Sequence, residues 1–262
     1  MSRVPRSLVC AVLAGVFTIT AMAGTTDSLW TRYQDARLSV RERLTSLHLV
    51  IHELRAYDVD SSRALAERMR AEALVAKDTL MTALAERDLG IAAIIQRDND
   101  RARLHLERAL ELYLQVGDSV GHKGAGAALS SLGIVHKNAG RMNEAVTAYR
   151  RCIAEHRLAN DEGGTVYALN GLGLVHEMQG TYDSALVYYG AVAEVAARLK
   201  MEDMEAAGYG NMANVNAEMG RIGEAIDLTY RSLAIMERLG DRKGVALPHR
   251  DQRAEARPGR AR

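Results

Sequence analysis

The feature that most constrains this sequence is a segment that recurs with a period of 40 residues. In three copies a glycine stands five residues before an alanine, at Gly140, Gly180 and Gly220. A constant interval separates these glycines from three upstream pairs, Leu132-Gly133, Leu172-Gly173 and Met212-Ala213. Repeats of this length indicate stacked copies of one small structural unit rather than a single globular core.

Two weaker copies precede these three. The pair Leu89-Gly90 is followed by an alanine at the same interval as the later pairs are. An insertion near residues 117–119 accounts for the spacing of 43 residues to the next copy. Farther upstream, residues 48–57 and 61–76 are predicted to form another helix pair. A serine followed three residues later by a glutamate, starting at Ser39, predicts a capping box at the start of its first helix.

Each unit is predicted to be a pair of helices. Proline is absent between residues 6 and 247, and an interior proline would cost a helix roughly 3 kcal/mol. The first helix carries apolar residues at helical spacing and ends at the repeated glycine, which readily adopts the left-handed conformation. The second helix is predicted to begin at Met142, Tyr182 and Ile222. Its small residues, such as Ala145, allow close helix crossing, and Tyr149 and Tyr189 are predicted to fill the gap between units.

These positions resemble the tetratricopeptide repeat family, in the 40-residue variant of bacterial sensor and scaffold proteins. The large residue before the Leu-Gly pair stands at Leu129, Leu169 and Tyr209. Ala145 and Ala185 are each followed by a tyrosine four residues later. The chain departs from the pattern where His136, His176 and Asn216 replace the first aromatic, and no proline closes the units.

The resemblance implies an all-α fold, a right-handed superhelical α-solenoid of antiparallel helix pairs. We expect a helical region with a degenerate repeat over residues 24–83, followed by the solenoid over 84–240. Its units are predicted at residues 84–117, 124–160, 164–200 and 204–240.

Residues 1–23 are predicted to be a signal peptide. Arg3 and Arg6 form a basic start, and Leu8 to Ala23 is uncharged and mostly apolar. The Ala-Met-Ala sequence before Gly24 suits cleavage. The protein is therefore expected to be periplasmic or secreted. The alternative is a membrane anchor over residues 7–26, a length of roughly 20 residues that just spans a bilayer.

The other end of the chain is expected to differ from the repeats. Residues 241–262 open a further unit and then reach Pro248 and a tail with five arginines, which is predicted to be disordered. Either the reading frame was lost near residue 247 or the gene was truncated there; the alternative is a genuine basic tail. The uncapped last repeat would expose an apolar side and favour self-association.

No pattern in the chain predicts catalysis, a metal site or a cofactor. Residues 24–247 carry a net charge of about −4, which argues against nucleic-acid binding. Residues 117–123 lack phosphate-loop spacing and are predicted to be a flexible loop between repeats. His48 and His52 lack the glutamate of a zinc-protease motif and are predicted to be packed or solvated. After signal cleavage Cys152 is the only cysteine, so no intramolecular disulfide is expected.

Two further residue types are assigned to packing. His136 and His176 recur at a repeat position that the family uses for packing, with pH-sensitive stability as the alternative. Cys152 stands at a small-residue position of a second helix, where burial is expected rather than a reactive thiol.

The family resemblance implies a protein-binding function, with the first helices lining a concave face. Asparagine suits that face because its amide both donates and accepts hydrogen bonds. The candidate partner-binding residues are Ser130, Lys137, Asn138, Tyr167, Asn170, Glu177, Asn211, Asn214 and Glu218. The leading hypothesis is an exported scaffold that binds a peptide or protein partner. The alternative is the extracytoplasmic sensing region of a signalling protein, a sensor histidine kinase or cyclase, that lacks its output domain.

Overall fold

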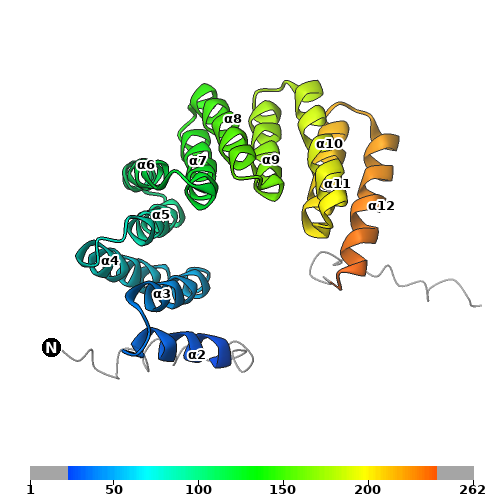
Figure 1. Cartoon of the computed structure of the whole chain (residues 1–262). Coiled ribbons are helices and arrows are strands. Elements are labelled where there is room, and N and C mark those ends of the chain that lie inside the picture. Colours follow the sequence, from blue (N-terminus) through cyan, green and yellow to red (C-terminus); the bar gives the residue numbers. More distant parts are fainter. Residues whose placement is uncertain (1–22, 241–262) are drawn as a thin grey trace, which may run out of the picture. The chain divides into compact units, whose positions relative to one another are not determined.

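The computed structural model describes residues 23–240, and every element in this range is a helix (Figure 1). The predicted signal peptide and basic tail lie outside the described residues, apart from Ala23. The chain forms two compact units that divide between Ala168 and Leu169, which we call unit 1 and unit 2. The helices are α2 (Ala23–Gln34), α3 (Val40–Leu54), α4 (Val59–Val75), α5 (Thr79–Ile95), α6 (Asn99–Val116), α7 (Ser119–Asn138), α8 (Met142–Leu158), α9 (Glu162–Met178), α10 (Tyr182–Leu199), α11 (Glu202–Glu218) and α12 (Ile222–Arg238).

Within each unit the predicted all-α solenoid of antiparallel helix pairs is confirmed. First helices alternate with second helices, and the second helices α8, α10 and α12 begin at the predicted residues. The repeated glycines have positive φ values of 73°, 70° and 74° at Gly140, Gly180 and Gly220, as their position after a helix requires. No helix within residues 23–240 is both long and apolar enough to cross a membrane.

The insertion that separates the weak copies from the strong ones is helical. α7 has 20 residues, whereas α5 and α9 have 17 each. The three extra residues lengthen the start of α7, which begins at Ser119 directly after its N-cap, Asp118. The prediction of a flexible loop over residues 117–123 is therefore wrong. The reason is that the Asp118 side chain accepts a hydrogen bond from the Gly121 amide and starts the helix.

Aspartates cap successive helices at 20-residue intervals in the first half of the chain. Asp58, Asp78, Asp98 and Asp118 each accept a hydrogen bond from the backbone amide three residues later. The predicted capping box at Ser39 is also confirmed, with Glu42 as its second member. In contrast, the N-cap residues of α8, α10, α11 and α12 make no side-chain cap hydrogen bond.

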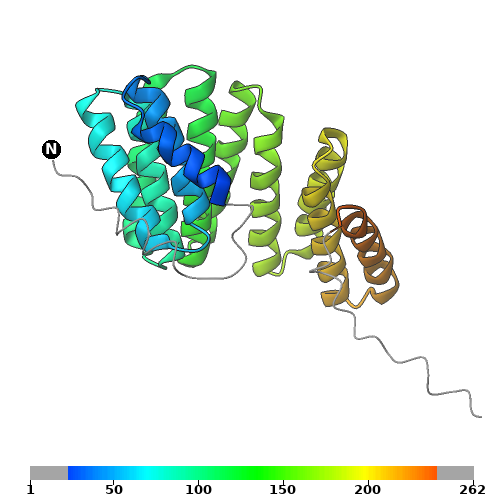
Figure 2. The same cartoon turned by 90° about the horizontal axis from the view of Figure 1, so that it is seen from below.

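Unit 1 has a continuous apolar core beneath its first helices. α2 lies beside α3 (Figure 2), and α3, α5 and α7 contact one another in order. Fully buried residues such as Leu44, Leu47 and Met69 join the helices α3 and α4, and Met81 and Leu89 extend the cluster onto α5. α5 is also in direct contact with α7, and these two helices carry the candidate site.

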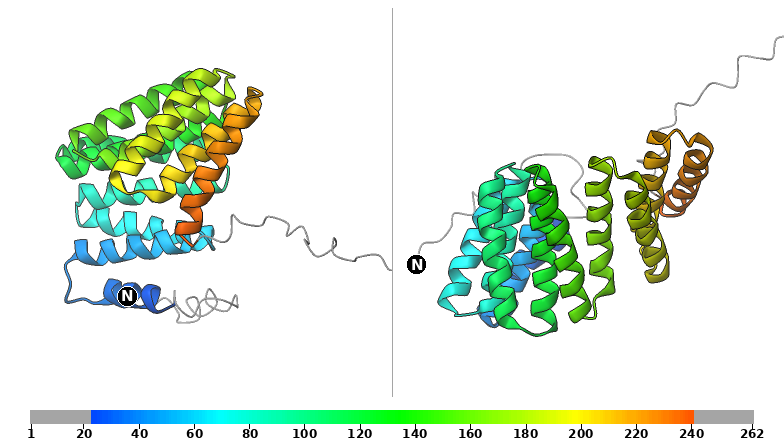
Figure 3. Two further views of the ribbon diagram at one scale, coloured as in Figure 1. Left: turned by 90° about the vertical axis from the view of Figure 1, so that its right-hand side faces the viewer. Right: turned by 90° about the horizontal axis from the view of Figure 1, so that it is seen from above.

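Unit 2 is held by a smaller cluster. α10, α11 and α12 pack as successive neighbours (Figure 3), and Ala185, Tyr189 and Val215 are buried at their centre. The ring of Tyr189 lies on Gly173 of its own repeat and packs with Val215 of the next repeat, and the ring of Tyr149 lies on Gly133 of its own repeat. Both tyrosines therefore fill space between the two helices of one repeat, and Tyr189 also fills the predicted space between successive repeats.

Candidate functional site

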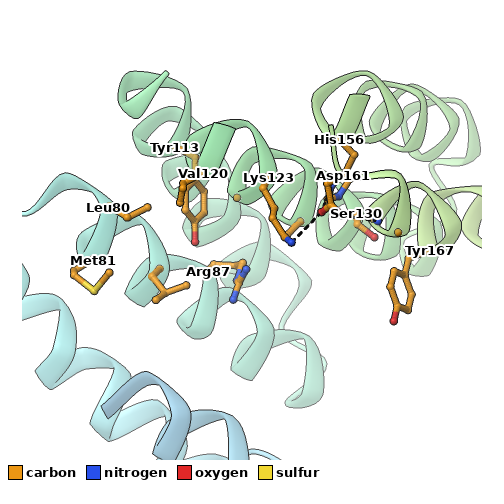
Figure 4. Close-up of a pocket in the computed structure, with 15 residues that line it drawn as sticks. Leu80, Met81, Arg87, Tyr113, Val120, Lys123, Ser130, His156, Asp161 and Tyr167 are labelled. Atoms are coloured by element: carbon orange, nitrogen blue, oxygen red, sulfur yellow. Dashed lines mark hydrogen bonds and ion pairs between the residues drawn. The ribbon is translucent and has the colours of Figure 1, made fainter. Parts of the chain in front are cut away.

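A cavity of about 610 Å³ opens on unit 1 (Figure 4). Its walls come from the first helices α5 and α7 and from the start of α9, with one side chain each from α6 and α8. We call it the unit 1 cavity. The first helices of successive repeats form the surface of this cavity. Their side chains that take no part in packing within the helix pairs point outward there.

Tyr113 forms the most buried polar part of this cavity. It is 2% exposed, and its hydroxyl has no hydrogen-bond partner among the described residues. Its ring lies against Gly124 of α7, where any larger side chain would overlap it. Burial raises the pKa of Tyr113 to about 12. The phenol therefore stays protonated at neutral pH and remains a hydrogen-bond donor.

Arg87 of α5 supplies a second unpartnered donor. Its Nε atom is buried without a hydrogen bond, and none of its nitrogens forms an ion pair within residues 23–240. Figure 4 shows the Tyr113 hydroxyl pointing toward the side of the cavity that holds Arg87. Buried polar groups are almost always hydrogen-bonded, so two unpartnered donors at one cavity indicate a place for a ligand acceptor.

The opposite wall is a polar network of three residues. Nζ of Lys123 lies 3.3 Å from Oδ2 of Asp161, and Nδ1 of His156 lies 3.1 Å from the same oxygen. The His156 ring is held between Gly126 and Gly164, which leave room for it. Burial lowers the pKa of His156, although Asp161 opposes this shift. Burial alone would raise the pKa of Asp161, but the hydrogen bond from Lys123 brings it below its usual value.

Apolar side chains complete the cavity. Leu80 and Leu84 of α5 and Val120 of α7 line it, and Val120 belongs to the extra turn of α7. Tyr167 lies at the other end and is 52% exposed. The cavity therefore offers an apolar patch beside donors for an acidic or carbonyl group, and it has no nucleophile positioned by a base.

The predicted partner-binding residues fall into three groups. Ser130 and Tyr167 line the unit 1 cavity. Asn211 and Asn214 line a second cavity of about 380 Å³ between α11 and α12, which we call the unit 2 cavity. Asn170 accepts a hydrogen bond of 2.8 Å from Asn211 and so supports it. The remaining residues line neither cavity: Lys137, Asn138, Glu177 and Glu218.

Glu177 has a structural partner rather than a free carboxylate. It accepts a hydrogen bond from the hydroxyl of buried Tyr189. Its position on a first helix predicted a binding role, but a tyrosine on the second helix of the same repeat binds its carboxylate. The sequence could not show this contact, because it depends on how closely the two helices cross.

Sequence reasoning missed Arg87, Tyr113, His156 and Asp161. Arg87 stands 43 residues before Ser130, so it occupies the same repeat position once the insertion is counted. Extending the register by one copy would have found it. Tyr113 and His156 are also 43 apart, and both pack on a glycine of the next first helix.

The other residues that the sequence singled out have packing partners. Nδ1 of His48 lies 2.6 Å from Oδ2 of Asp88. His136 accepts a hydrogen bond from Arg141, and the His176 ring stacks on Tyr188. Cys152 is buried, and burial raises the pKa of its thiol to about 12. The described residues contain no group of three or more histidine, cysteine and carboxylate side chains that would hold a metal ion.

Stacked helix pairs with open cavities on their first helices define a helical-repeat scaffold. Residues 124–198 match the family described as tetratricopeptide repeat. This match shows tetratricopeptide repeats in that part of the chain, and the helix pairs before and after it have the same kind of fold. A search of curated proteins found no match.

Solved structures share this fold at low sequence identity. BtubC from P. vanneervenii is 15% identical with a TM-score of 0.68, and the match covers 92% of this chain and 100% of that one. A Rap protein complexed with Competence and Sporulation Factor is 10% identical with a TM-score of 0.70, over 92% and 68% of the two chains. A signal transduction ATPase with a tetratricopeptide repeat sensor, from Pyrococcus horikoshii, is 14% identical with a TM-score of 0.68, over 91% and 35%.

Proposed function

We propose that this protein is an exported scaffold that binds a peptide or protein partner in the unit 1 cavity. The observation that carries the proposal is the pair of unpartnered buried donors, the Tyr113 hydroxyl and Nε of Arg87, at a cavity of about 610 Å³. Leaving a buried donor unsatisfied costs about 1–3 kcal/mol. A ligand that supplies the missing acceptor recovers this free energy on binding.

The lining favours an extended peptide segment with one apolar side chain and one acidic or carbonyl acceptor. The apolar side chain would contact Leu80, Leu84 and Val120, and the acceptor would lie near Arg87 and Tyr113. Lys123 is 66% exposed and adds a second positive charge at the opening. A peptide binds such a surface without chemical conversion, which agrees with the scaffold character of the fold.

The fold relatives give this proposal support of a general kind. The Rap protein was solved in complex with Competence and Sporulation Factor, and the archaeal ATPase carries its repeats as a sensor. These two relatives support a binding role for the repeats of this chain.

A peptide library displayed against the chain tests the proposal. Selected peptides should bind Arg87→Ala and Lys123→Ala at least about tenfold more weakly than the unmodified chain, since a hydrogen bond to a charged group contributes about 1.5–3 kcal/mol. Glu194→Gln, at an exposed residue of α10, is the matched control and should bind normally. Peptides whose affinity is the same for all variants would show that the unit 1 cavity is not the binding site.

Export is part of the same proposal and rests on the sequence of residues 1–23. Protein recovered from an exporting host should begin at Gly24 when its N-terminus is sequenced. Material that begins at Met1 and stays in the cytoplasm would contradict export.

The sensing region of a signalling protein is the second candidate, favoured by the archaeal ATPase, of whose length this chain spans 35%. It predicts that the downstream DNA, read in all frames, encodes a hydrophobic span followed by an output domain. A downstream sequence that encodes neither of these would contradict the sensing-region hypothesis and favour the free scaffold.

A further inference from the structure

Two arginines on neighbouring first helices of unit 1 have no ion-pair partner. Arg87 of α5 lines the unit 1 cavity (Figure 4), and Arg55 is the C-cap residue of α3, which contacts α5. Both are half-buried, and neither forms an ion pair within residues 23–240. Arginines of the second helices differ, since Arg63 and Arg103 each pair with the glutamate four residues later.

Asp88 of α5 brings one carboxylate to the same place. It is 1% exposed, and its Oδ2 atom lies 2.6 Å from Nδ1 of His48 on α3. Burial lowers the pKa of Arg55; the charge of Asp88 opposes this shift, and the charge of Arg87 adds to it. The three charges therefore act on one another across the contact of α3 with α5, and we call Arg55, Arg87 and Asp88 the arginine cluster. Two positive charges stand against one negative charge, and a protonated His48 would only increase the excess.

The positive excess lies at the α3 side of the unit 1 cavity. Taking a charge out of water costs free energy that only a partner recovers. In this part of the cavity the Tyr113 hydroxyl and Nε of Arg87 are also buried donors without an acceptor. The cation on the opposite wall differs, because Nζ of Lys123 already lies 3.3 Å from Oδ2 of Asp161. A negative group of a ligand is therefore stabilised most strongly at the arginine cluster.

We infer that the ligand of the unit 1 cavity is a peptide with an acidic side chain whose carboxylate binds between Arg55 and Arg87. This inference rests on the proposed function and makes it more specific, because it selects a carboxylate over a neutral carbonyl. It also adds Arg55, which is not part of the cavity lining, as a residue that determines specificity. A guanidinium suits this role, since its planar N–H groups match the two oxygens of a carboxylate.

The size of the excess selects the kind of anion. One unmatched positive charge suits a carboxylate, which carries one negative charge, whereas a phosphoryl group carries about −1.5 to −2 at neutral pH. The depth of the donors selects its source. Because the Tyr113 hydroxyl and Nε of Arg87 are buried, a carboxylate on a flexible side chain reaches them more readily than one on the peptide backbone.

Peptides selected from a displayed library by the unmodified chain test the inference. Each is synthesised twice, with its glutamate or aspartate and with the corresponding amide. The acidic peptide should bind the unmodified chain at least about tenfold more tightly than its amide form, because hydrogen bonds to charged groups are the stronger ones. Arg55→Gln should weaken the acidic peptide about tenfold and the amide form less than about twofold.

Three controls separate recognition from folding and from other anions. Arg63→Gln removes the same charge from α4, where Arg63 pairs with Glu67, and should change neither affinity. Arg55→Gln should leave the urea midpoint of the free chain unchanged or raise it, because burial disfavours a charge at this position. Amidation of the peptide's C-terminus should not alter binding, and phosphoserine in place of the glutamate should bind no more tightly.

The proposed function and this inference fail in different ways. Peptides that bind Arg87→Ala as tightly as the unmodified chain would contradict the proposed function and this inference with it. Peptides that depend on Arg87 but carry no acidic residue, or whose two forms change equally on Arg55→Gln, would overturn this inference alone. So would affinity that is lost on C-terminal amidation, or a phosphoserine peptide that binds more tightly than the glutamate peptide.

Discussion

In unit 1, aspartate side chains close the starts of α4, α5, α6 and α7, whereas the starts of α10, α11 and α12 in unit 2 have no side-chain cap. Unit 2 depends instead on the repeat pattern itself, with Tyr189 packed on Gly173 beside Ala185 and Val215. The two units reach the same helix pairs by different means. Three of the capped helices, α4, α5 and α6, belong to copies whose repeat pattern is weak, whereas α8 in unit 1 has no side-chain cap.

The difference also separates fold from function. The clearest repeat motifs lie in residues that packing uses, so they mark the core. The unit 1 cavity lies where the chain departs from the pattern, at the extra turn of α7 and at the large side chains Tyr113 and His156 in places where α10 has Ala196. Departures from a repeat are therefore the better guide to its binding surface.

The largest expected effect concerns the small core of unit 2. Tyr189→Ala should lower the free energy of unfolding by roughly 3–5 kcal/mol, because the tyrosine is fully buried and its removal leaves a cavity. Urea unfolding measures the loss, and hydrogen exchange should locate it in α10 and α11 rather than in α3 to α5. Glu194→Gln on the same helix should stay within about 0.5 kcal/mol. A loss spread evenly over both units would break the distinction between them.

The caps should matter only in unit 1. Asp58→Ala removes the hydrogen bond from the Ser61 amide to the Asp58 carboxylate and should cost about 1 kcal/mol in a urea melt. Arg221→Ala changes an N-cap residue of α12 that makes no side-chain cap bond, and should cost no more than about 0.5 kcal/mol. Equal costs at the two positions would show that the caps do not distinguish the units.

One position in unit 2 should gain stability. Lys200 ends α10 with φ at +57°, a left-handed conformation that costs a non-glycine residue about 1–2 kcal/mol. Lys200→Gly relieves this strain, and the greater freedom of glycine in the unfolded chain offsets part of the gain. The thermal midpoint should therefore rise, by the equivalent of about 0.5–1 kcal/mol. A lower midpoint would mean that the lysine side chain stabilises the turn.

The smallest effect is a dependence on pH in unit 1. Burial lowers the pKa values of His136 and His156 below the ordinary value of about 6.5. Both contribute stability that is present above pH 6.5 and is lost as the pH falls through it, because the unfolded chain then binds more protons. Urea midpoints at pH 7.5 and 5.5 should differ less in His156→Gln than in the unmodified chain. An identical pH dependence would contradict the assignment to His156.

Much of the fold could be predicted from the sequence. The glycines at 140, 180 and 220 fixed the ends of first helices, and the starts of α8, α10 and α12 followed from them. The sequence located the insertion but did not show its conformation, because three extra residues fit either a loop or a helical turn. The choice depended on Asp118 as a cap.

The site could be predicted only in part. Ser130, Tyr167, Asn211 and Asn214 line cavities, as their repeat positions suggested. Tyr113 was out of reach because its place in the cavity depends on the packing of its ring on Gly124 of the next helix, a contact that the sequence alone does not show.

The most direct test of the central claim is Tyr113→Phe, measured for stability and for affinity toward a library-selected peptide. Removing an unpartnered buried hydroxyl should leave the free energy of unfolding unchanged or raise it by about 1 kcal/mol. The same change should weaken peptide binding about fivefold to tenfold, because the ligand loses its donor. Asn170→Ala with Asn214→Ala, the competing prediction in unit 2, should then leave affinity unchanged. Normal affinity in Tyr113→Phe, with binding lost only in the asparagine variant, would contradict the placement of the site in unit 1.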